Sequence, residues 1–203
     1  MCGGIYVEWG KVSRWEVKIK DEPLVKRTIR LLREAGVEDI AISSLDPKMK
    51  KYGVPVLKHD YIYRTDDPST FWGDGFYPMT EPVCYIYGDV YFSPEAIQTI
   101  VNFTTDGIMF FASVAPFDPR YIKNWAEPFA FKVVDTEHFR NSLRMMKEYH
   151  EKHMFNRHPC SWELWQVIKN TPLNDIRSNY CGISDYSCDI DYPEDIERLE
   201  ARL

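Results

Sequence analysis

Segments with the periodicity of buried strands alternate along this chain with segments of helical periodicity. The clearest helix is predicted to begin at Pro23, which suits a first helical position, and to end at Gly36. A short apolar strand over 39–44 follows after a few residues, as in one arm of a β–α–β unit. The alternation predicts an α/β fold with three layers, α/β/α, built on a mixed, mostly parallel sheet.

The same alternation continues to the end of the chain. Further strands are predicted over 54–57, 83–87, 108–112 and 129–134. Further helices are predicted over 94–101, 136–149, 161–168 and 193–199, with Ser93 and Thr136 as caps. Residues 60–80 are rich in Asp, Pro, Gly, Ser and Thr and predict a long functional loop. No repeat or linker divides the 203 residues, so we expect a single domain over 1–203.

Charge and cysteine content exclude several classes of protein. The chain has 25 Lys and Arg against 31 Asp and Glu, a net charge of −6, and no long basic run. This argues against a nucleic-acid partner, because such binding rests on many cation–phosphate contacts. Five cysteines in irregular spacing predict free thiols in a reducing compartment, with neither disulfide nor structural metal. Without a signal region, or any run of about 18 apolar residues, we expect a cytoplasmic protein that does not enter a membrane.

Two acidic positions are the strongest candidates for chemistry. Asp89 stands at the carboxyl end of a predicted strand, where α/β sheets bind their ligands. Asp189 and Asp191 share one face of an extended segment. Mg²⁺ prefers one or two carboxylates together with water and phosphate oxygens, so Asp89 and a carboxylate of this later segment predict a magnesium site. The alternatives are that Asp89 is a turn residue and that Asp191, like Glu194 and Asp195, caps the last helix.

The amino-terminal stretch supplies groups that suit phosphate. Backbone amides at Gly3 and Gly4 suit a close approach to a phosphate. Four cations follow before the first predicted helix: Lys11, Arg14, Lys18 and Lys20. The alternative for each cation is a solvated surface position. The candidates for stacking are Trp9, Trp15 and Trp72, which lie in polar, loop-like surroundings, whereas Trp162 and Trp165 are predicted to pack in the core.

Taken in order, these segments resemble a known family. Residues 21–25 and 36–40 are similar to the GKPLI and GVDDI runs of nucleotidyltransferases that have a Rossmann-like, GT-A-like (nucleotide-diphospho-sugar transferase) fold. Residues 88–90 are similar to the metal-binding GD segment of that family, and 189–195 to its closing DIDTPED segment. Residues 127–131 resemble the segment in which sugar-nucleotide enzymes place a glutamate on the sugar. The resemblance covers sugar-phosphate nucleotidyltransferases and cytidylyltransferases.

The resemblance implies a reaction and a set of site residues. A phosphorylated acceptor, either a sugar phosphate or a phospho-alcohol, would attack the α-phosphate of a nucleoside triphosphate, and pyrophosphate would leave. Asp89 and Asp191 would hold Mg²⁺. The phosphates would meet Gly3, Gly4, Lys11, Arg14 and one of Lys18 and Lys20, with Lys20 and Arg14 counted as catalytic. Asp74 would contact the nucleotide, Trp72 the base or acceptor, and Glu127 the acceptor.

The glycine-rich phosphate loop departs from the family pattern. Arg14 stands where the family has its lysine, but Ile5 replaces a loop glycine and Val7 the family arginine. The first strand, which in the family precedes this loop, is almost absent because the sequence begins at Met1. Because these departures lie in the loop that would hold the triphosphate, they weaken the prediction of triphosphate cleavage more than the prediction of the fold.

Two other functions stay open from the sequence. A glycosyltransferase of the same fold would use a nucleotide sugar, but such enzymes carry a D-x-D pair at the strand end, and here Tyr91 follows Asp89 at that spacing. A non-catalytic nucleotide-binding protein would fit the altered loop. Release of pyrophosphate from a triphosphate separates the first function from both.

Overall fold

The centre of the protein is a four-stranded mixed sheet. The computed structural model describes residues 1–2, 13–58, 63–64, 67–114, 126–173 and 179–203. The strand order is β5-β8-β7-β9, and the strands span Val83–Ile86 (β5), Pro128–Val133 (β8), Ile108–Ser113 (β7) and Cys181–Ile183 (β9). The α/β class and the mixed sheet are therefore confirmed.

Three of these strands, β5, β7 and β9, run in the same direction, so the mostly parallel mixed sheet that the sequence predicts is confirmed. β8 runs antiparallel to both β5 and β7, and β9 is parallel to β7. The physical reason for the direction of β8 is that it follows β7 along the chain with no helix predicted between them. A strand that returns beside its predecessor without a crossover helix pairs antiparallel.

Three smaller strand pairs surround this sheet. β3 (Ile42–Ser43) pairs with β4 (Val56–Leu57) in parallel, and β6 (Val90–Tyr91) pairs with β10 (Cys188–Asp189) antiparallel. A hairpin of β1 (Lys18–Ile19) and β2 (Glu22–Pro23) was not predicted; its turn holds Lys20 and Asp21 at positive φ. Because Pro23 belongs to β2, it is the N-cap and not the first residue of helix α1, which spans Leu24–Glu34. Gly36 ends the helix with φ of 84°, as predicted.

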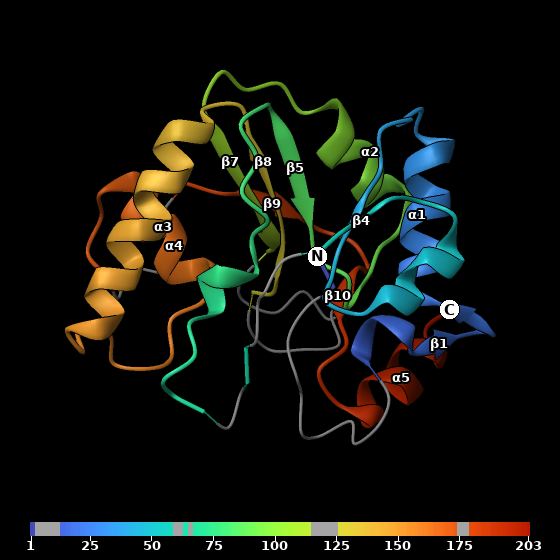
Figure 1. Cartoon of the computed structure of the whole chain (residues 1–203). Coiled ribbons are helices and arrows are strands. Elements are labelled where there is room, and N and C mark those ends of the chain that lie inside the picture. Colours follow the sequence, from blue (N-terminus) through green and yellow to red (C-terminus); the bar gives the residue numbers. More distant parts are fainter. Residues whose placement is uncertain (3–12, 59–62, 65–66, 115–125, 174–178) are drawn as a thin grey trace.

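Helices cover both faces of the sheet. Figure 1 shows α3 (Thr136–Glu151) and α4 (Ser161–Lys169) on one side, and α1 and α2 (Pro94–Asn102) on the other. The predicted cap Ser93 is confirmed, because its hydroxyl accepts the amide of Ala96. Helix α3 is capped by Asp135 instead of Thr136, since the Asp135 carboxylate accepts the amide of His138. The last helix, α5, spans Pro193–Glu200, and short 3-10 turns lie at Arg14–Glu16 (η2), Pro47–Tyr52 (η3) and Trp72–Gly75 (η4).

The core is rich in aromatic rings that lie between the sheet and helices α3 and α4. Phe110 on β7 stacks on Phe131 of β8 with 4.6 Å between ring centroids. Phe139 of α3 and Trp165 of α4 complete this group, and all four side chains are almost fully buried. The prediction that Trp165 packs in the core is confirmed.

The helices and cysteines carry two further observations. None of the helices in the described ranges is long and apolar enough to cross a membrane. The five cysteines are free thiols, and burial raises the pKa of Cys2 to about 11 and that of Cys84 to about 12. Both thiols are therefore protonated at neutral pH.

Candidate functional site

The turn after β5 brings the backbone close to the amino terminus. The Gly88 amide donates to the Met1 carbonyl at 2.8 Å. A Cβ at Gly88 would lie 2.6 Å from that same carbonyl oxygen and 2.5 Å from the Cys2 sulfur. Glycine is therefore required here for the close approach of two backbone segments, which in turn positions Asp89.

Gly88→Ala is expected to lower the free energy of unfolding by about 1–3 kcal/mol, because the new methyl group would overlap the Met1 carbonyl oxygen and the Cys2 sulfur and force both to shift. Urea unfolding followed by tryptophan fluorescence measures the change. Gly107→Ala is the matched control, since a Cβ there meets nothing within 4 Å. Equal stability of the two variants would show that the contact between Gly88 and Met1 is wrong.

Pairing between β6 and β10 joins the two acidic segments. Asp189 lies opposite Val90, and the Ile190 amide donates to the Asp89 carbonyl at 2.9 Å. The segment that follows is held by Asp195, whose buried carboxylate accepts the amides of Asp191 and Tyr192 at 3.0 and 2.9 Å. Asp195 thus caps α5, as predicted, as the N3 residue of a capping box whose N-cap is Tyr192, and the Asp191 carboxylate is left to face the site.

Arg14 connects the two predicted metal ligands. It lies in η2, and its side chain is 9% exposed. One guanidinium nitrogen, Nη1, donates to the Asp191 carboxylate and lies 3.8 Å from Oδ2 of Asp89. The structure therefore brings Asp89, Asp191 and Arg14 together, although Asp89 and Asp191 are separated by roughly half of the chain.

Glu127 belongs to the same group of acids. Its amide donates to the Ser113 hydroxyl at 2.7 Å, which fixes the residue just before β8. Carboxylate oxygens of Glu127, Asp189 and Asp191 all lie within 4.8 Å of one another. We call Asp89, Glu127, Asp189 and Asp191 the carboxylate cluster. From the sequence, Glu127 was predicted to contact the acceptor and Asp191 was preferred to Asp189. The structure brings these three together, and Arg14 links Asp191 to Asp89.

The cluster concentrates negative charge in a confined space. Burial raises the pKa of Asp89; Arg14 lowers it, and Asp191 raises it further by like-charge repulsion. Among the described residues that line the adjacent cavity, Arg14 is the only cationic side chain. Around this cavity, among the described residues, the Arg14 guanidinium and the Met1 ammonium face the carboxylates of Asp89, Asp189 and Asp191. Such a set of oxygen donors suits a divalent cation.

Asp89→Asn is expected to raise the thermal midpoint of the metal-free protein at pH 7–8. The pKa of Asp89 is raised in the folded state, so its stabilising contribution is complete below the ordinary carboxyl pKa and is lost as the pH rises through the raised value. The uncharged amide of the asparagine avoids this loss. The difference in thermal midpoint between the variant and the unsubstituted protein should therefore become smaller as the pH falls. Thermal unfolding in chelator from pH 4 to 8 measures it. Asp106→Asn, at an exposed position, is the control, and a lower midpoint for Asp89→Asn at pH 7–8 would contradict the expectation.

A cavity of about 270 Å³ opens above the cluster. Its walls include flat aromatic side chains from four separate segments: Trp15, Tyr63, Trp72 and Tyr87. The ring of Trp72 lies edge-on to that of Tyr87, and the Tyr87 hydroxyl is 2.9 Å from the Ser161 hydroxyl. Trp15 and Trp72 were identified from the sequence as stacking candidates, whereas Tyr63, Tyr87 and Ser161 were missed. The third stacking candidate, Trp9, lies outside the described residues. Tyr87 had a usable signal, because it ends the predicted strand two residues before Asp89.

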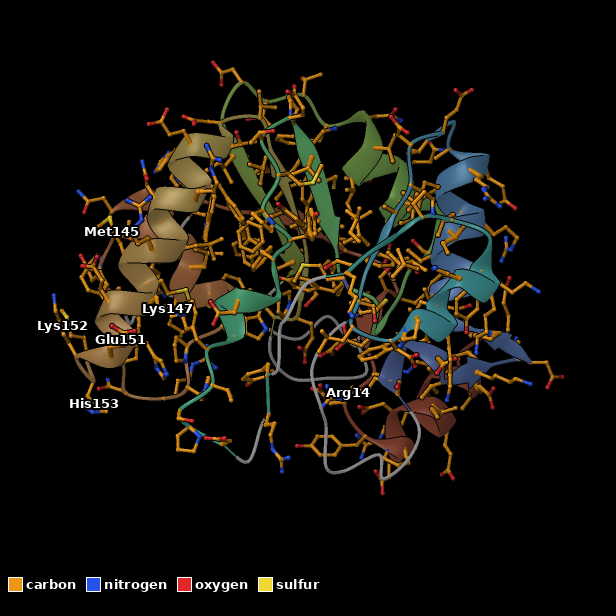
Figure 2. The ribbon with its side chains drawn as sticks, in the orientation of Figure 1. Arg14, Met145, Lys147, Glu151, Lys152 and His153 are labelled. Carbon is orange, nitrogen blue, oxygen red and sulfur yellow. The ribbon has the colours of Figure 1, made fainter. Side chains whose placement is uncertain are left out.

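Three predicted site residues lie away from this cavity. Lys18 and Lys20 are exposed on the β1–β2 hairpin, where the Lys20 amide donates to Glu200 of α5. Asp74 forms an exposed ion pair with Lys147 of α3, at 3.0 Å. Figure 2 shows Lys147 on α3, well separated from Arg14. In this arrangement Lys18, Lys20 and Asp74 do not line the cavity, because the hairpin and the pairing with α3 hold them elsewhere.

The predicted phosphate contacts of Gly3, Gly4 and Lys11 fall outside the described residues. They stay predictions. The cation that the structure does place at the site is Arg14, and it meets carboxylates there.

Comparisons with known proteins give structural likeness without close relatives. No family model matches the chain, and no curated protein matches it. Among solved structures, it is similar to CTP:phosphocholine cytidylyltransferase (LicC) from Streptococcus pneumoniae, with 16% identity and a TM-score of 0.49 over 94% of this chain and 90% of that one. It is also similar to HddC from Yersinia pseudotuberculosis, with 13% identity and a TM-score of 0.49 over 95% and 91%. The function of this chain has to be argued from its own site.

Proposed function

We propose that this chain is a metal-dependent nucleotidyltransferase. It would transfer a nucleoside monophosphate from a nucleoside triphosphate to a phosphorylated acceptor, a sugar phosphate or a phospho-alcohol, and release pyrophosphate. The observation that carries the proposal is the convergence of Asp89 and Asp191 with Arg14 beside one cavity. The order of motifs along the sequence supports this reaction class.

The residues present fit a magnesium ion. Their donors are carboxylate oxygens, the ligand type that Mg²⁺ prefers. Burial raises the pKa of Asp89 most, and Asp191 raises it further by like-charge repulsion, which a bound cation would relieve. Asp89 and Asp191 would hold the ion, with Asp189 and Glu127 next to them. When bound, it would neutralise charge on the phosphate oxygens of the nucleotide.

The remaining residues would bind and orient the two substrates. Arg14 stays protonated at every physiological pH and presents a fork of donors that matches phosphate, so we assign it to the triphosphate. Trp72, Tyr63 and Tyr87 offer flat faces and edges to a base or an acceptor. Phosphoryl transfer needs positioning and charge stabilisation more than covalent help, and these groups supply both.

A pyrophosphate-release assay tests the proposal. Each of the four common nucleoside triphosphates is incubated with Mg²⁺ and a panel of phosphosugars and phospho-alcohols, and the product is identified by mass. Pyrophosphate that appears only when one triphosphate and one acceptor are both present supports the function. Nucleotide binding with no pyrophosphate in any combination overturns it.

One observation favours a glycosyltransferase as the second candidate. Asp189 and Asp191 form a D-x-D pair, and both line the cavity. Such a pair would hold the diphosphate of a nucleotide sugar through a metal. Transfer of sugar with release of a nucleoside diphosphate, in place of pyrophosphate, would select this function.

A further inference from the structure

Two histidines meet at the carboxyl-terminal end of α3, outside the carboxylate cluster. His150 belongs to the last turn of that helix, and His158 to the segment that leads from α3 to α4. Their ring centroids lie 5.1 Å apart, and both residues are partly buried. Figure 2 labels Glu151, the residue after His150, at this end of the helix. We call His150 and His158 the histidine pair.

Both imidazole rings contact the backbone of residues 68–70. Nε2 of His158 lies 3.0 Å from the Thr70 carbonyl oxygen, and His150 forms a hydrogen bond with the Pro68 carbonyl. The His150 ring also stacks on the ring of Phe71, which is buried, with 5.7 Å between ring centroids. The histidine pair therefore holds this segment against the end of α3.

The segment held by the histidine pair continues directly into the wall of the cavity. Phe71 precedes Trp72, whose side chain lines the cavity and lies edge-on to the ring of Tyr87. Tyr63, which also lines the cavity, contacts His158 with 5.3 Å between ring centroids. The positions of Trp72 and Tyr63 beside the carboxylate cluster therefore depend on the histidine pair.

Hydrogen bonding selects the neutral form of His158. A carbonyl oxygen can only accept, so Nε2 carries the hydrogen and Nδ1 keeps its lone pair. Nδ1 is buried and has no hydrogen-bond partner among the described residues. Protonation would place an N–H there without an acceptor, which is unfavourable for a buried group.

The surroundings of His150 also favour the neutral ring. Desolvation by burial lowers the pKa of His150 most, and the charges of His158 and His153 lower it further. The hydrogen bond with Pro68 and the charge of Glu151 act in the opposite direction, and the pKa remains below its ordinary value. The stability that the neutral ring contributes is therefore complete above the ordinary histidine pKa and is lost as the pH falls through the lowered value.

The charged side chains on the neighbouring elements do not offset a second positive charge. On α3, Lys147 lies over the ring of Phe71 and pairs with Asp74 of η4. Next to His158 in the chain, Arg157 pairs with Glu163 of α4. The two carboxylates that these elements supply are thus already paired with cations.

We propose that the histidine pair is a pH-sensitive switch that holds residues 68–72 against α3 while both rings are neutral and releases them when both are protonated. Two imidazolium ions at this spacing repel each other, and separation of the rings gives Nδ1 of His158 access to water. Trp72 and Tyr63 then lose their positions in the cavity wall. A loss of substrate affinity in acid rests on the proposed function, whereas the release of residues 68–72 does not.

Hydrogen exchange followed by mass spectrometry tests the release in the full chain without nucleotide or metal. In the described structure the amides of Thr70 and Asp74 donate to the carbonyls of Asp67 and Phe71. After correction for the intrinsic effect of pH on exchange, peptides that cover residues 69–76 are expected to exchange at least about 10-fold faster at pH 5.5 than at pH 7.5. Peptides from β7 and β8 are expected to show no such change.

His158→Gln separates the charge from the hydrogen bond. The glutamine amide can still donate to the Thr70 carbonyl but cannot gain a proton, so exchange over 69–76 should stay slow at both pH values. His138→Gln, at an exposed position at the start of α3, is the matched control and should keep the full pH dependence. An equal acceleration in His158→Gln, or no acceleration in the unsubstituted protein, overturns the proposal.

Nuclear magnetic resonance of the histidine ring protons gives a second measurement that needs no variant to fold. The histidine pair is expected to titrate in two coupled steps, with apparent pKa values at least about one unit apart. Independent titration of the two rings at one value overturns the proposal. Neither measurement involves pyrophosphate release, so failure of the switch and failure of the proposed function remain distinguishable.

Discussion

Asp191→Asn is expected to lower the rate of pyrophosphate release by about 10²–10³-fold or more. The substitution keeps the shape of the side chain and removes its charge, at a point where the carboxylate meets Arg14 and lies within 4.8 Å of two other acids. The fold should survive, because the backbone amide at this position remains bonded to Asp195. Initial rates with saturating triphosphate, acceptor and Mg²⁺ measure the loss.

Glu194→Gln is the matched control for Asp191→Asn. Glu194 is an exposed acid three residues further along, at the start of α5, and its loss is expected to change the rate by less than about twofold. Asp89→Asn should behave like Asp191→Asn. Binding of Mn²⁺ by calorimetry should weaken in both Asn variants and not in Glu194→Gln. A fully active Asp191→Asn protein with unchanged circular dichroism would exclude the metal-binding role.

Phe131→Ala is expected to cost about 3–5 kcal/mol in the free energy of unfolding, and about 10 °C in the thermal midpoint. The Phe131 side chain is 0% exposed and stands at the centre of the core, 4.6 Å from the ring of Phe110 and 5.7 Å from that of Phe139. These neighbours are held by β7 and α3 and cannot close around the vacated space, so the cavity adds to the lost transfer free energy. Urea unfolding measures the change.

Val134→Ala is the control for Phe131→Ala. Val134 follows β8 and is 37% exposed, so truncation there is expected to cost less than about 1 kcal/mol. The two variants differ in burial and ring packing within three residues of the same chain segment. A cost below about 1 kcal/mol for Phe131→Ala would show that the aromatic core between β7, β8 and α3 is packed differently from the arrangement described.

Local signals in the sequence identify the elements well. Ser93 and Pro94 begin α2, Gly36 ends α1 in the left-handed conformation, and Asp195 caps α5. Each of these depends on hydrogen bonds between residues within about four positions, so the pattern along the chain contains the information. Two predicted helix starts are shifted by one residue. Pro23 is the N-cap of α1 and not its first residue, and Asp135 takes the N-cap position of α3 in place of Thr136.

Several residues of the site could be predicted from the sequence, but the way they come together in space could not. Asp89 was identified from its place after a strand, and Asp191 from its place before a helix. The structure places Lys20 and Asp74, which the sequence also named, away from the cavity, and nothing local shows that Lys20 turns toward α5 or that Asp74 pairs with Lys147. Tyr63 and Ser161 were missed for the same reason: they reach the cavity only through the packing of distant segments.

By itself, the sequence determined the α/β class, helices α1 to α5, strands β3, β4, β5, β7 and β8, and the acidic character of the site; it did not predict β1, β2, β6, β9 or β10. Only the tertiary structure decided that β8 runs antiparallel, that β6 pairs with β10, and that Arg14 stands between Asp89 and Asp191. Capping and burial periodicity depend on residues that are neighbours within one helical turn or one strand pleat, so the local sequence predicts them. Strand pairing and ion pairs join residues far apart in the chain, and their energies depend on which surfaces the whole fold brings into contact.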